Sequence, residues 1–115
     1  MKKFKVKHTV ANGPEAKIQK RIIQRLRYEE WFVKETHGNM YQSGFPDLFA
    51  THSLYGHRWI EVKNPERTSN LFTNAQLENF PKLCAHGSGV WVLTDDSDSE
   101  YQKLFKRFNW YVYCL

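Results

Sequence analysis

Cysteine is scarce in this sequence of 115 residues, and long apolar runs are missing. The two cysteines, Cys84 and Cys114, lie far apart in no CxxC or Cys/His pattern, so we predict neither a disulfide framework nor a zinc site and expect reduced packing residues. No stretch approaches the roughly 18 consecutive apolar residues of a membrane span, and no apolar segment follows the basic start. We therefore expect a soluble, intracellular protein that uses neither a membrane nor an organic cofactor.

Two metal-binding patterns are missing as well. The five histidines, at positions 8, 37, 52, 57 and 86, form no HxxxH or HExxH pattern and are expected at the surface or in the core. The aspartates at 95, 96 and 98 lack the spacing of a calcium loop, which favours turn and cap positions for them.

Positive charge exceeds negative charge in the chain. Lys and Arg number 17 against 12 Asp and Glu, a formal net charge of +5. This balance favours a polyanionic partner such as nucleic acid, although many small proteins are mildly basic for solubility alone. The position of the charge is more informative, because it gathers in an N-terminal arm over residues 1–12 and in the helix expected next. The candidate DNA contacts are Lys3, Lys5, Lys7, Lys17 and Arg21.

One helix and three strands are expected in the first half of the chain. The helix covers residues 12–30, where Pro14 suits the first turn. Its apolar residues recur at helical spacing: Ile18, Ile22, Ile23 and Leu26. The segments 31–37, 47–52 and 57–63 are rich in aromatic and branched residues and are expected as strands. The short turn at 53–56 makes the last two an antiparallel hairpin.

A second helix is expected to open at residues 73–76 and to end at Gly87, with Pro81 kinking or splitting it. Its apolar face would carry Leu77, Phe80, Leu83 and Cys84.

The rest of the chain predicts a strand, a helix and a last strand. Residues 89–94 are apolar on both faces, which favours a central strand. A third helix is expected over 101–108, with Ser97 and Glu100 as its capping box, and a strand over 109–115. The order α-β-β-β-α-β-α-β predicts a single α/β domain over residues 1–115, a mixed sheet flanked by helices.

The chemistry concentrates between Gly44 and Lys63, where a Gly-x-Pro-Asp turn opens one strand and Glu-Val-Lys closes the next. Alternation places Glu61 and Lys63 on one face, about 6.6 Å apart, and the hairpin brings Asp47 to the same edge of the sheet. Two carboxylates there predict an oxygen site suited to Mg²⁺ or Mn²⁺, with the backbone carbonyl of Val62 as a further candidate ligand. Lys63 would orient a water or stabilise charge on phosphoryl oxygens, so the set favours phosphodiester hydrolysis.

These residues also have purely structural interpretations. Asp47 fits a turn after Pro46, and Glu61 with Lys63 fits an ion pair on an exposed strand face. Glu61 nevertheless lies in the apolar sequence Trp-Ile-Glu-Val, where an acid indicates a specific partner. Turn, spacing and setting together favour the functional interpretation.

At this point the sequence resembles the PD-(D/E)xK nucleases, and among them the stand-alone VRR-NUC domains carried by bacteriophages. Residues 44–47 match the family's G-x-PD and residues 61–63 its ExK; Glu15 matches an acid in the first helix and Gln76 a glutamine opening the next helix. The match covers roughly residues 14–95 and implies a restriction-endonuclease-like fold. Phe45 departs from the pattern, where an aliphatic residue is expected.

The resemblance implies further roles for two of these residues. Glu15 would be an additional metal ligand, direct or through water, and Gln76 would act in catalysis. Both have structural alternatives that the sequence leaves open, because Asn12 with Glu15 and Thr73 with Gln76 have capping-box spacing.

The resemblance also implies a substrate. It points to a structure-selective endonuclease on branched DNA such as four-way (Holliday) junctions, in DNA repair or recombination, from a phage in a bacterial host. A homodimer is implied too, and the apolar ending 110–115 favours it. The alternatives are a flap or nicking enzyme, a restriction-type duplex cutter, and a catalytically silent DNA-binding module.

Overall fold

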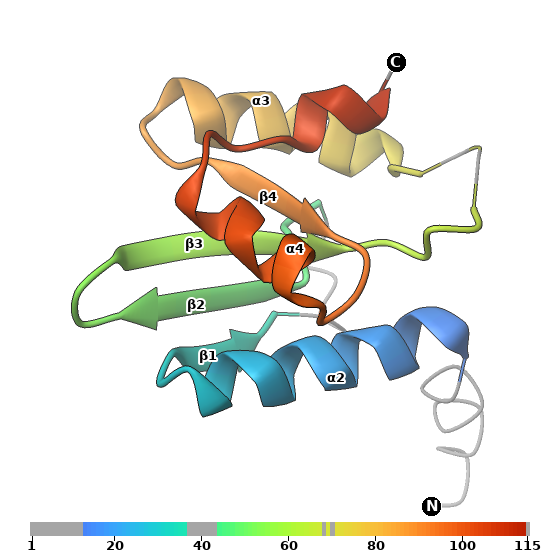
Figure 1. Cartoon of the computed structure of the whole chain (residues 1–115). Coiled ribbons are helices and arrows are strands. Elements are labelled where there is room, and N and C mark those ends of the chain that lie inside the picture. Colours follow the sequence, from blue (N-terminus) through green and yellow to red (C-terminus); the bar gives the residue numbers. More distant parts are fainter. Residues whose placement is uncertain (1–12, 37–43, 68, 70, 115) are drawn as a thin grey trace, which may run out of the picture.

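Four strands form one mixed sheet in the computed structural model, which describes residues 13–36, 44–67, 69 and 71–114 (Figure 1). The strands are β1 (Phe32–Glu35), β2 (Leu48–His52), β3 (Gly56–Val62) and β4 (Val90–Leu93), in that spatial order. The first three pair antiparallel, and β4 joins β3 in parallel. The predicted hairpin is thus confirmed, whereas the basic arm and the loop at 37–43 lie outside the described residues.

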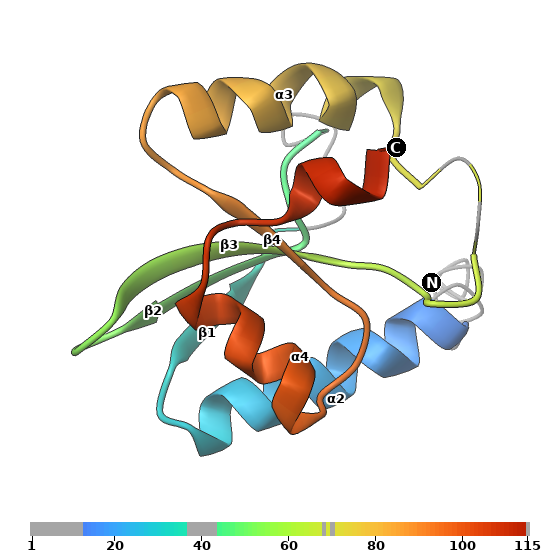
Figure 2. The same cartoon turned by 45° about the horizontal axis from the view of Figure 1, so that its top comes forward.

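Helix α2 (Pro14–Tyr28) covers one face of the sheet, as its apolar spacing predicted (Figure 2). Proline stands in its first turn, where a missing N–H costs nothing. At its end, the N–H of Trp31 donates to the carbonyl of Leu26, and Glu30 adopts a φ of 71°, the left-handed turn that closes many helices. The buried stripe is Ile18, Ile22, Ile23 and Leu26.

Helix α3 (Asn74–Ala85) lies over the opposite face (Figure 2). Its buried face is set by Gln76 and Phe80, while Leu77 is 46% exposed, so the prediction that Leu77 shares the apolar face is wrong. The helix also runs through Pro81 without a break. Pro81 has no N–H to donate to the carbonyl of Leu77 one turn earlier. Both residues are exposed, so water can donate to that carbonyl instead.

Strand β4 occupies an edge of the described sheet, so the predicted central position is wrong. Its apolar residues are explained by cover on both faces, from α3 on one side and from α4 (Asp98–Gln102) with η3 (Lys103–Phe105) on the other (Figure 2). The open edge is closed by a side chain instead of a strand. Asn109 accepts from the N–H of Val92 at 2.6 Å and donates to the Val92 carbonyl at 3.2 Å.

The end of the chain differs most from expectation. The third helix begins earlier and is shorter than predicted, and Ser97 caps it by accepting from the N–H of Glu100. The Glu100 carboxylate does not complete a capping box with Ser97, since its Oε1 accepts from the N–H of Thr94. The predicted last strand is wrong, because residues Trp110–Cys114 form a 3-10 helix, η4. The Asn109 side chain already occupies the strand edge.

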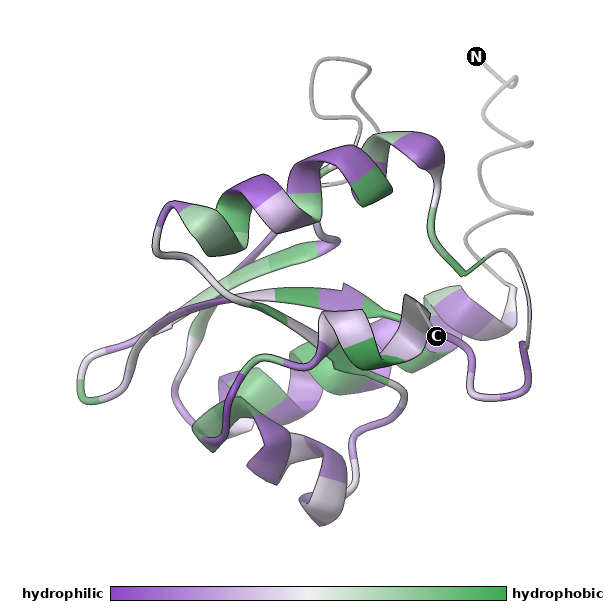
Figure 3. Cartoon of the chain, turned by 90° about the horizontal axis from the view of Figure 1, so that it is seen from above, coloured by the Kyte–Doolittle hydropathy of each residue, from purple (hydrophilic) through white to green (hydrophobic). Residues whose placement is uncertain are grey.

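The fold class predicted from the sequence is confirmed, a mixed α/β domain whose sheet is flanked by helices. Apolar segments follow the strands and the inner sides of the helices (Figure 3). No helix in the described part of the chain has the length and apolarity to cross a membrane. The main core lies between α2, the sheet and α4, and comprises Ile18, Ile22, Ile23, Leu26, Trp31, Val33, Leu48, Ala50, Ile60, Val62, Leu93, Tyr101 and Leu104.

Candidate active site

The predicted meeting of Asp47 and Glu61 is present in the structure. The hairpin register sets Leu48 opposite Ile60, and so brings the residues next to them together at one edge of the sheet. The N–H of Asp47 donates to Glu61 Oε1 at 3.2 Å, and Asp47 Oδ2 accepts from the N–H of Val62 at 2.8 Å. Each carboxylate is therefore fixed by the backbone of the other strand.

Gly44 explains why this turn begins with glycine. Its φ is +88°, and a Cβ at this position would stand 2.8 Å from the carbonyl oxygen of Ala75 in α3. The chain before Asp47 thus presses against the start of α3, and the N–H of Thr36 holds the Asp47 carbonyl from the other side at 2.9 Å. The sequence motif includes Gly44, but only its positive φ and its close approach to α3 show why a glycine is required there.

Lys63 lies beside Glu61, as alternation along the strand predicted. Its Nζ is 2.8 Å from Glu61 Oε2, and its side chain is only 7% exposed. The ring of Phe72 covers the ammonium group at 5.0 Å from the ring centre. Phe72 in turn contacts the rings of Phe80 and Trp110. Nothing in the sequence pattern pointed to Phe72, which reaches the lysine from the loop between β3 and α3.

Gln76 forms the capping box that the sequence offered as its structural role, and it also contacts the Glu61 carboxylate. Its Oε1 accepts from the N–H of Thr73 at 3.0 Å, and the Thr73 hydroxyl accepts from its own N–H, which completes a capping box. Its Nε2 donates to Glu61 Oε2 at 3.0 Å. Because the amide oxygen is committed to the helix cap, its nitrogen is held toward the carboxylate.

Glu15 reaches the same end of the sheet from α2. Its Oε2 accepts from the N–H of Asn64, directly after Lys63, at 3.2 Å. The N-cap of α2 is Gly13, which makes no side-chain cap, and Asn12 of the alternative capping box lies outside the described residues. The carboxylate of Glu15 thus joins the helix to the chain leaving β3.

Burial dominates the electrostatics of this cluster. Glu61 is 2% exposed, and loss of water followed by repulsion from Asp47 raises its pKa to about 8, against the lowering effect of Lys63 and Gln76. Burial also raises the pKa of Asp47, and the Glu15 carboxylate adds to that rise. The N–H of Val62 and the Lys63 ammonium oppose it. Without a cation, burial and mutual repulsion therefore favour the protonated form of these carboxyl groups.

The donor set fits a hard divalent cation. Two carboxylates that repel one another would both be stabilised by a cation between them, and carboxylate oxygens are the ligands that Mg²⁺ takes. Within the described residues, no three acidic, His or Cys side chains form a ready metal cluster. A cation at Asp47 and Glu61 would complete its coordination with water or substrate oxygens, as Mg²⁺ commonly does.

The predicted DNA contacts are described only in part. Lys17 and Arg21 are exposed on α2, and the Nε of Arg21 lies 3.6 Å from the Asp96 carboxylate. Lys3, Lys5 and Lys7 lie outside the described residues. The predicted turn and cap roles in the aspartate segment agree with the structure, where Asp95 accepts from the N–H of Ser97 at 2.7 Å.

Comparison with known proteins tests the resemblance. No family model matches the sequence, and no similar curated protein is found. A solved structure described as a VRR_NUC domain superposes with a TM-score of 0.63 at 20% identity, over 77% of this chain and 92% of the other. The chain therefore has the fold of a VRR_NUC domain, and the resemblance predicted from its motifs is confirmed at the level of the fold.

Proposed function

We propose that this chain is a metal-dependent DNA nuclease, and that Asp47, Glu61 and Lys63 carry its chemistry. The observation that supports this most directly is the buried Glu61 carboxylate, held by Lys63 at 2.8 Å and by the backbone of Asp47 at 3.2 Å, in a VRR_NUC fold. Ion pairs that merely decorate a protein surface are not buried in this way. A buried ion pair also adds little to folding stability, because the cost of desolvating both charges offsets their attraction. Stability alone therefore does not explain the burial of Glu61 and Lys63.

Each side chain has a part in hydrolysis. A water oxygen bonds to phosphorus as the ester P–O bond breaks; the water gives up one proton and the leaving oxygen takes up one. A bound Mg²⁺ or Mn²⁺ would supply Lewis-acid stabilisation of the phosphate. The ion would be held by Asp47, Glu61, the carbonyl of Val62 and, directly or through water, Glu15. The ammonium group of Lys63 would stabilise the negative charge that develops on the phosphoryl oxygens.

Gln76 is assigned to the same reaction as a positioning residue. Its Nε2 holds Glu61 Oε2 at 3.0 Å, beside the Lys63 ammonium on that oxygen. This leaves Oε1, which has the longer contact of 3.2 Å, as the oxygen better able to face a cation. Gln76→Ala would release the carboxylate and open the helix cap, so Gln76→Glu, which can still cap α3, separates the two effects.

Branched DNA is the substrate that we propose, with four-way junctions as the form that the resemblance implies. Lys17 and Arg21, with Lys3, Lys5 and Lys7 of the arm, would contact backbone phosphates without reading bases. A homodimer would present two such sites about a two-fold axis, and a four-way junction has matching symmetry. Light scattering that gives a monomer both free and on DNA would remove the dimer from this proposal.

One panel of substrates tests the proposed function. The full chain is incubated with labelled duplex, flap, fork and four-way-junction DNA, with Mg²⁺ or with chelator, and Glu61→Gln is run beside it. Cleavage of branched DNA only with Mg²⁺ and only by the wild type is expected. Binding without cleavage under every condition would instead indicate a catalytically silent module, and faster cutting of linear duplex would indicate a restriction-type enzyme.

A further inference from the structure

Four rings in contact lead along the sheet to the candidate carboxylates. The ring of Phe45 meets that of Trp59 at 5.7 Å, Trp59 meets Phe49 at 5.0 Å, and Phe49 meets His57 at 5.8 Å. We call Phe45, Phe49, His57 and Trp59 the aromatic row. Trp59 stands two residues before Glu61 on β3, so both project from the same face of the sheet about 6.6 Å apart.

The aromatic row lies on the sheet face opposite α2. Ile60 and Val62, its alternating neighbours on β3, belong to the core against α2, whereas the row faces the side of α3. Helix α3 packs against β4, the strand farthest from β1 in the sheet (Figure 1). Phe45 is 40% exposed, His57 is exposed, and Phe49 and Trp59 are half-buried. Phe32, on β1 opposite Thr51, is 61% exposed.

Basic and polar groups border the row. Lys34 is exposed and stands opposite Phe49 in the β1–β2 register. Phe45 also forms one wall of a groove of about 260 Å³, whose other lining residues include Lys82, His86 and Ser88 of α3 and the turn after it. Lys82 pairs with Glu78 at 3.2 Å, but both groups are largely exposed, and such a pair gives up little when a phosphate approaches.

We propose that the aromatic row and this groove bind unpaired nucleotides of the DNA strand whose backbone enters the candidate site. The inference rests on the proposed nuclease function and narrows its substrate to branched DNA with unpaired bases at the branch. A base inside a duplex is already stacked on both faces, so only an unpaired base can offer its face to a ring. Flaps and forks have such bases, and a four-way junction has them where crossover bases unstack.

Continuity with the carboxylates argues for nucleic acid as the occupant. Phe45 lies two residues before Asp47, and Trp59 two residues before Glu61. A second protein copy seated on the row would therefore cover the carboxylates and exclude substrate. A stacked base would instead set its own phosphodiester beside them, with Lys34 and His86 near the backbone.

The test measures stacking directly, without cleavage. The full chain in chelator is mixed with a duplex that carries a single-stranded tail, with 2-aminopurine as the first unpaired base, and with a blunt duplex that carries the same probe. We expect quenching of the tail probe and binding of the tailed duplex about fivefold or more tighter than the blunt one. Phe45→Leu removes the ring but keeps an apolar side chain, and Phe45→Tyr keeps the ring.

Phe105→Leu is the matched control. Phe105 is 39% exposed, like Phe45, but belongs to the ring cluster of Trp31, Tyr55 and Tyr101. Phe45→Leu should lose both the quenching and the preference for the tail, while Phe45→Tyr and Phe105→Leu keep them. Thermal unfolding shows whether each variant is folded. The wild-type comparison of tailed and blunt DNA tests the inference even if a variant fails to fold.

Three outcomes would overturn the inference. These are equal binding of tailed and blunt DNA without quenching, an unchanged Phe45→Leu, and a dimer that Phe45→Leu dissociates, which would make the face a protein interface. Cleavage of any of these DNAs with Mg²⁺ would still support the nuclease, so this failure is distinct from that of the proposed function. Conversely, stacking without cleavage would leave the row in place on an inactive module.

Discussion

Acidic side chains gather at two places in this molecule, and the two differ in how far water reaches them. At the ends of β2 and β3, Asp47 and Glu61 lie in a buried setting, and burial is the first cause that raises the pKa of both. After β4, Asp95 and Asp96 are partly exposed and Asp98 is exposed. There the pKa of Asp95 is lowered, chiefly because Ser97 donates hydrogen bonds to it.

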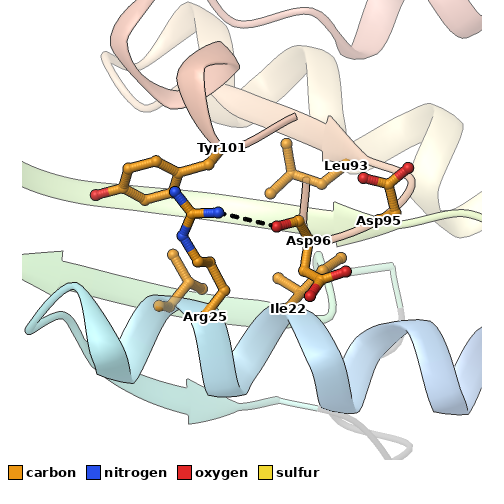
Figure 4. A pocket seen from close by; sticks show the side chains of 7 residues that line it. Ile22, Arg25, Leu93, Asp95, Asp96 and Tyr101 are labelled. Carbon is orange, nitrogen blue, oxygen red and sulfur yellow. Dashed lines mark hydrogen bonds between the residues drawn. The ribbon is translucent and has the colours of Figure 1, made fainter. Parts of the chain in front are cut away.

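The exposed cluster has cationic partners too. Asp98 lies 3.0 Å from one terminal guanidinium nitrogen of Arg25. The other terminal nitrogen of Arg25 donates to the backbone carbonyl of Asp96 at 3.1 Å (Figure 4). The cavity lined by Arg25, Asp95 and Asp96 has a volume of about 10 Å³, room for roughly one water molecule. Acids and bases in proximity therefore do not make a site. The difference lies in the buried strand ends, where charge is costly without a further partner.

The largest test of this comparison is to neutralise one acid from each cluster. Glu61→Gln should lower the initial rate of DNA cleavage by about 100-fold or more, since it removes a carboxylate that would hold the metal ion. Lys63→Ala and Asp47→Asn should do the same, with most DNA affinity retained. Asp96→Asn is the control and should stay within about twofold of wild type. A cleavage rate for Glu61→Gln equal to that of the wild type would contradict the assignment of Glu61 to the active site.

Metal ions should separate the clusters by a readout that needs no activity. Mg²⁺ and Ca²⁺ should both raise the thermal unfolding midpoint. At an ion concentration a hundredfold above the dissociation constant, binding should add about 2.7 kcal/mol to the free energy of unfolding. Only Mg²⁺ or Mn²⁺ should support cleavage, because Ca²⁺ is larger and takes looser geometry. Glu61→Gln should lose most of the midpoint shift and Asp96→Asn should keep it. An equal loss in both variants would contradict the comparison.

The two clusters should also give opposite dependences of stability on pH. In chelator, the unfolded chain releases the Glu61 proton near the ordinary pKa of 4.5, whereas the folded chain holds it until about 8. The folded state therefore binds more protons in this window, and stability falls as pH rises through it. Urea unfolding from pH 5 to 8 should show this fall, and Glu61→Gln should flatten it. Asp47, whose pKa is also raised, would leave a residual slope.

The smallest effect is expected at Asp95. Its lowered pKa means that the folded state favours the carboxylate, so its contribution is present above the ordinary pKa of 3.8 and is lost as pH falls below it. Asp95→Asn should cost on the order of 0.5 kcal/mol at neutral pH and nothing at acid pH. Urea unfolding of the variant at several pH values measures this. A larger loss at acid pH than at neutral pH would contradict the expected direction for Asp95.

The centre of the site could be predicted because it depends on local rules. The short turn over residues 53–55 fixes the hairpin, the hairpin fixes the register, and the register brings Asp47 to Glu61. Period-two alternation then puts Lys63 beside Glu61. Gln76 was ambiguous for a physical reason, since one amide has two ends and the structure uses one for the helix cap and the other for the carboxylate.

The features that sequence did not predict depend on long-range contacts. Phe72 lies over Lys63 because Phe80 and Trp110, from separate elements, support it. An apolar run such as β4 fits a central strand as well as an edge strand that is covered on both faces. The cover here comes from α3, α4 and η3, which the local sequence of β4 does not reveal. The chain end has the composition of a strand, but the sheet edge it would join is already filled.

That filled edge limits how copies of this chain can associate. An unpaired strand usually offers N–H and C=O groups to any extended segment that arrives, and so invites sheets to grow from one molecule into the next. Here the amide of Asn109 occupies both backbone groups of Val92, as the neighbouring residue of another strand would. Asn109→Ala should expose them and promote concentration-dependent strand addition, whereas in the native chain these two groups of Val92 are already bonded.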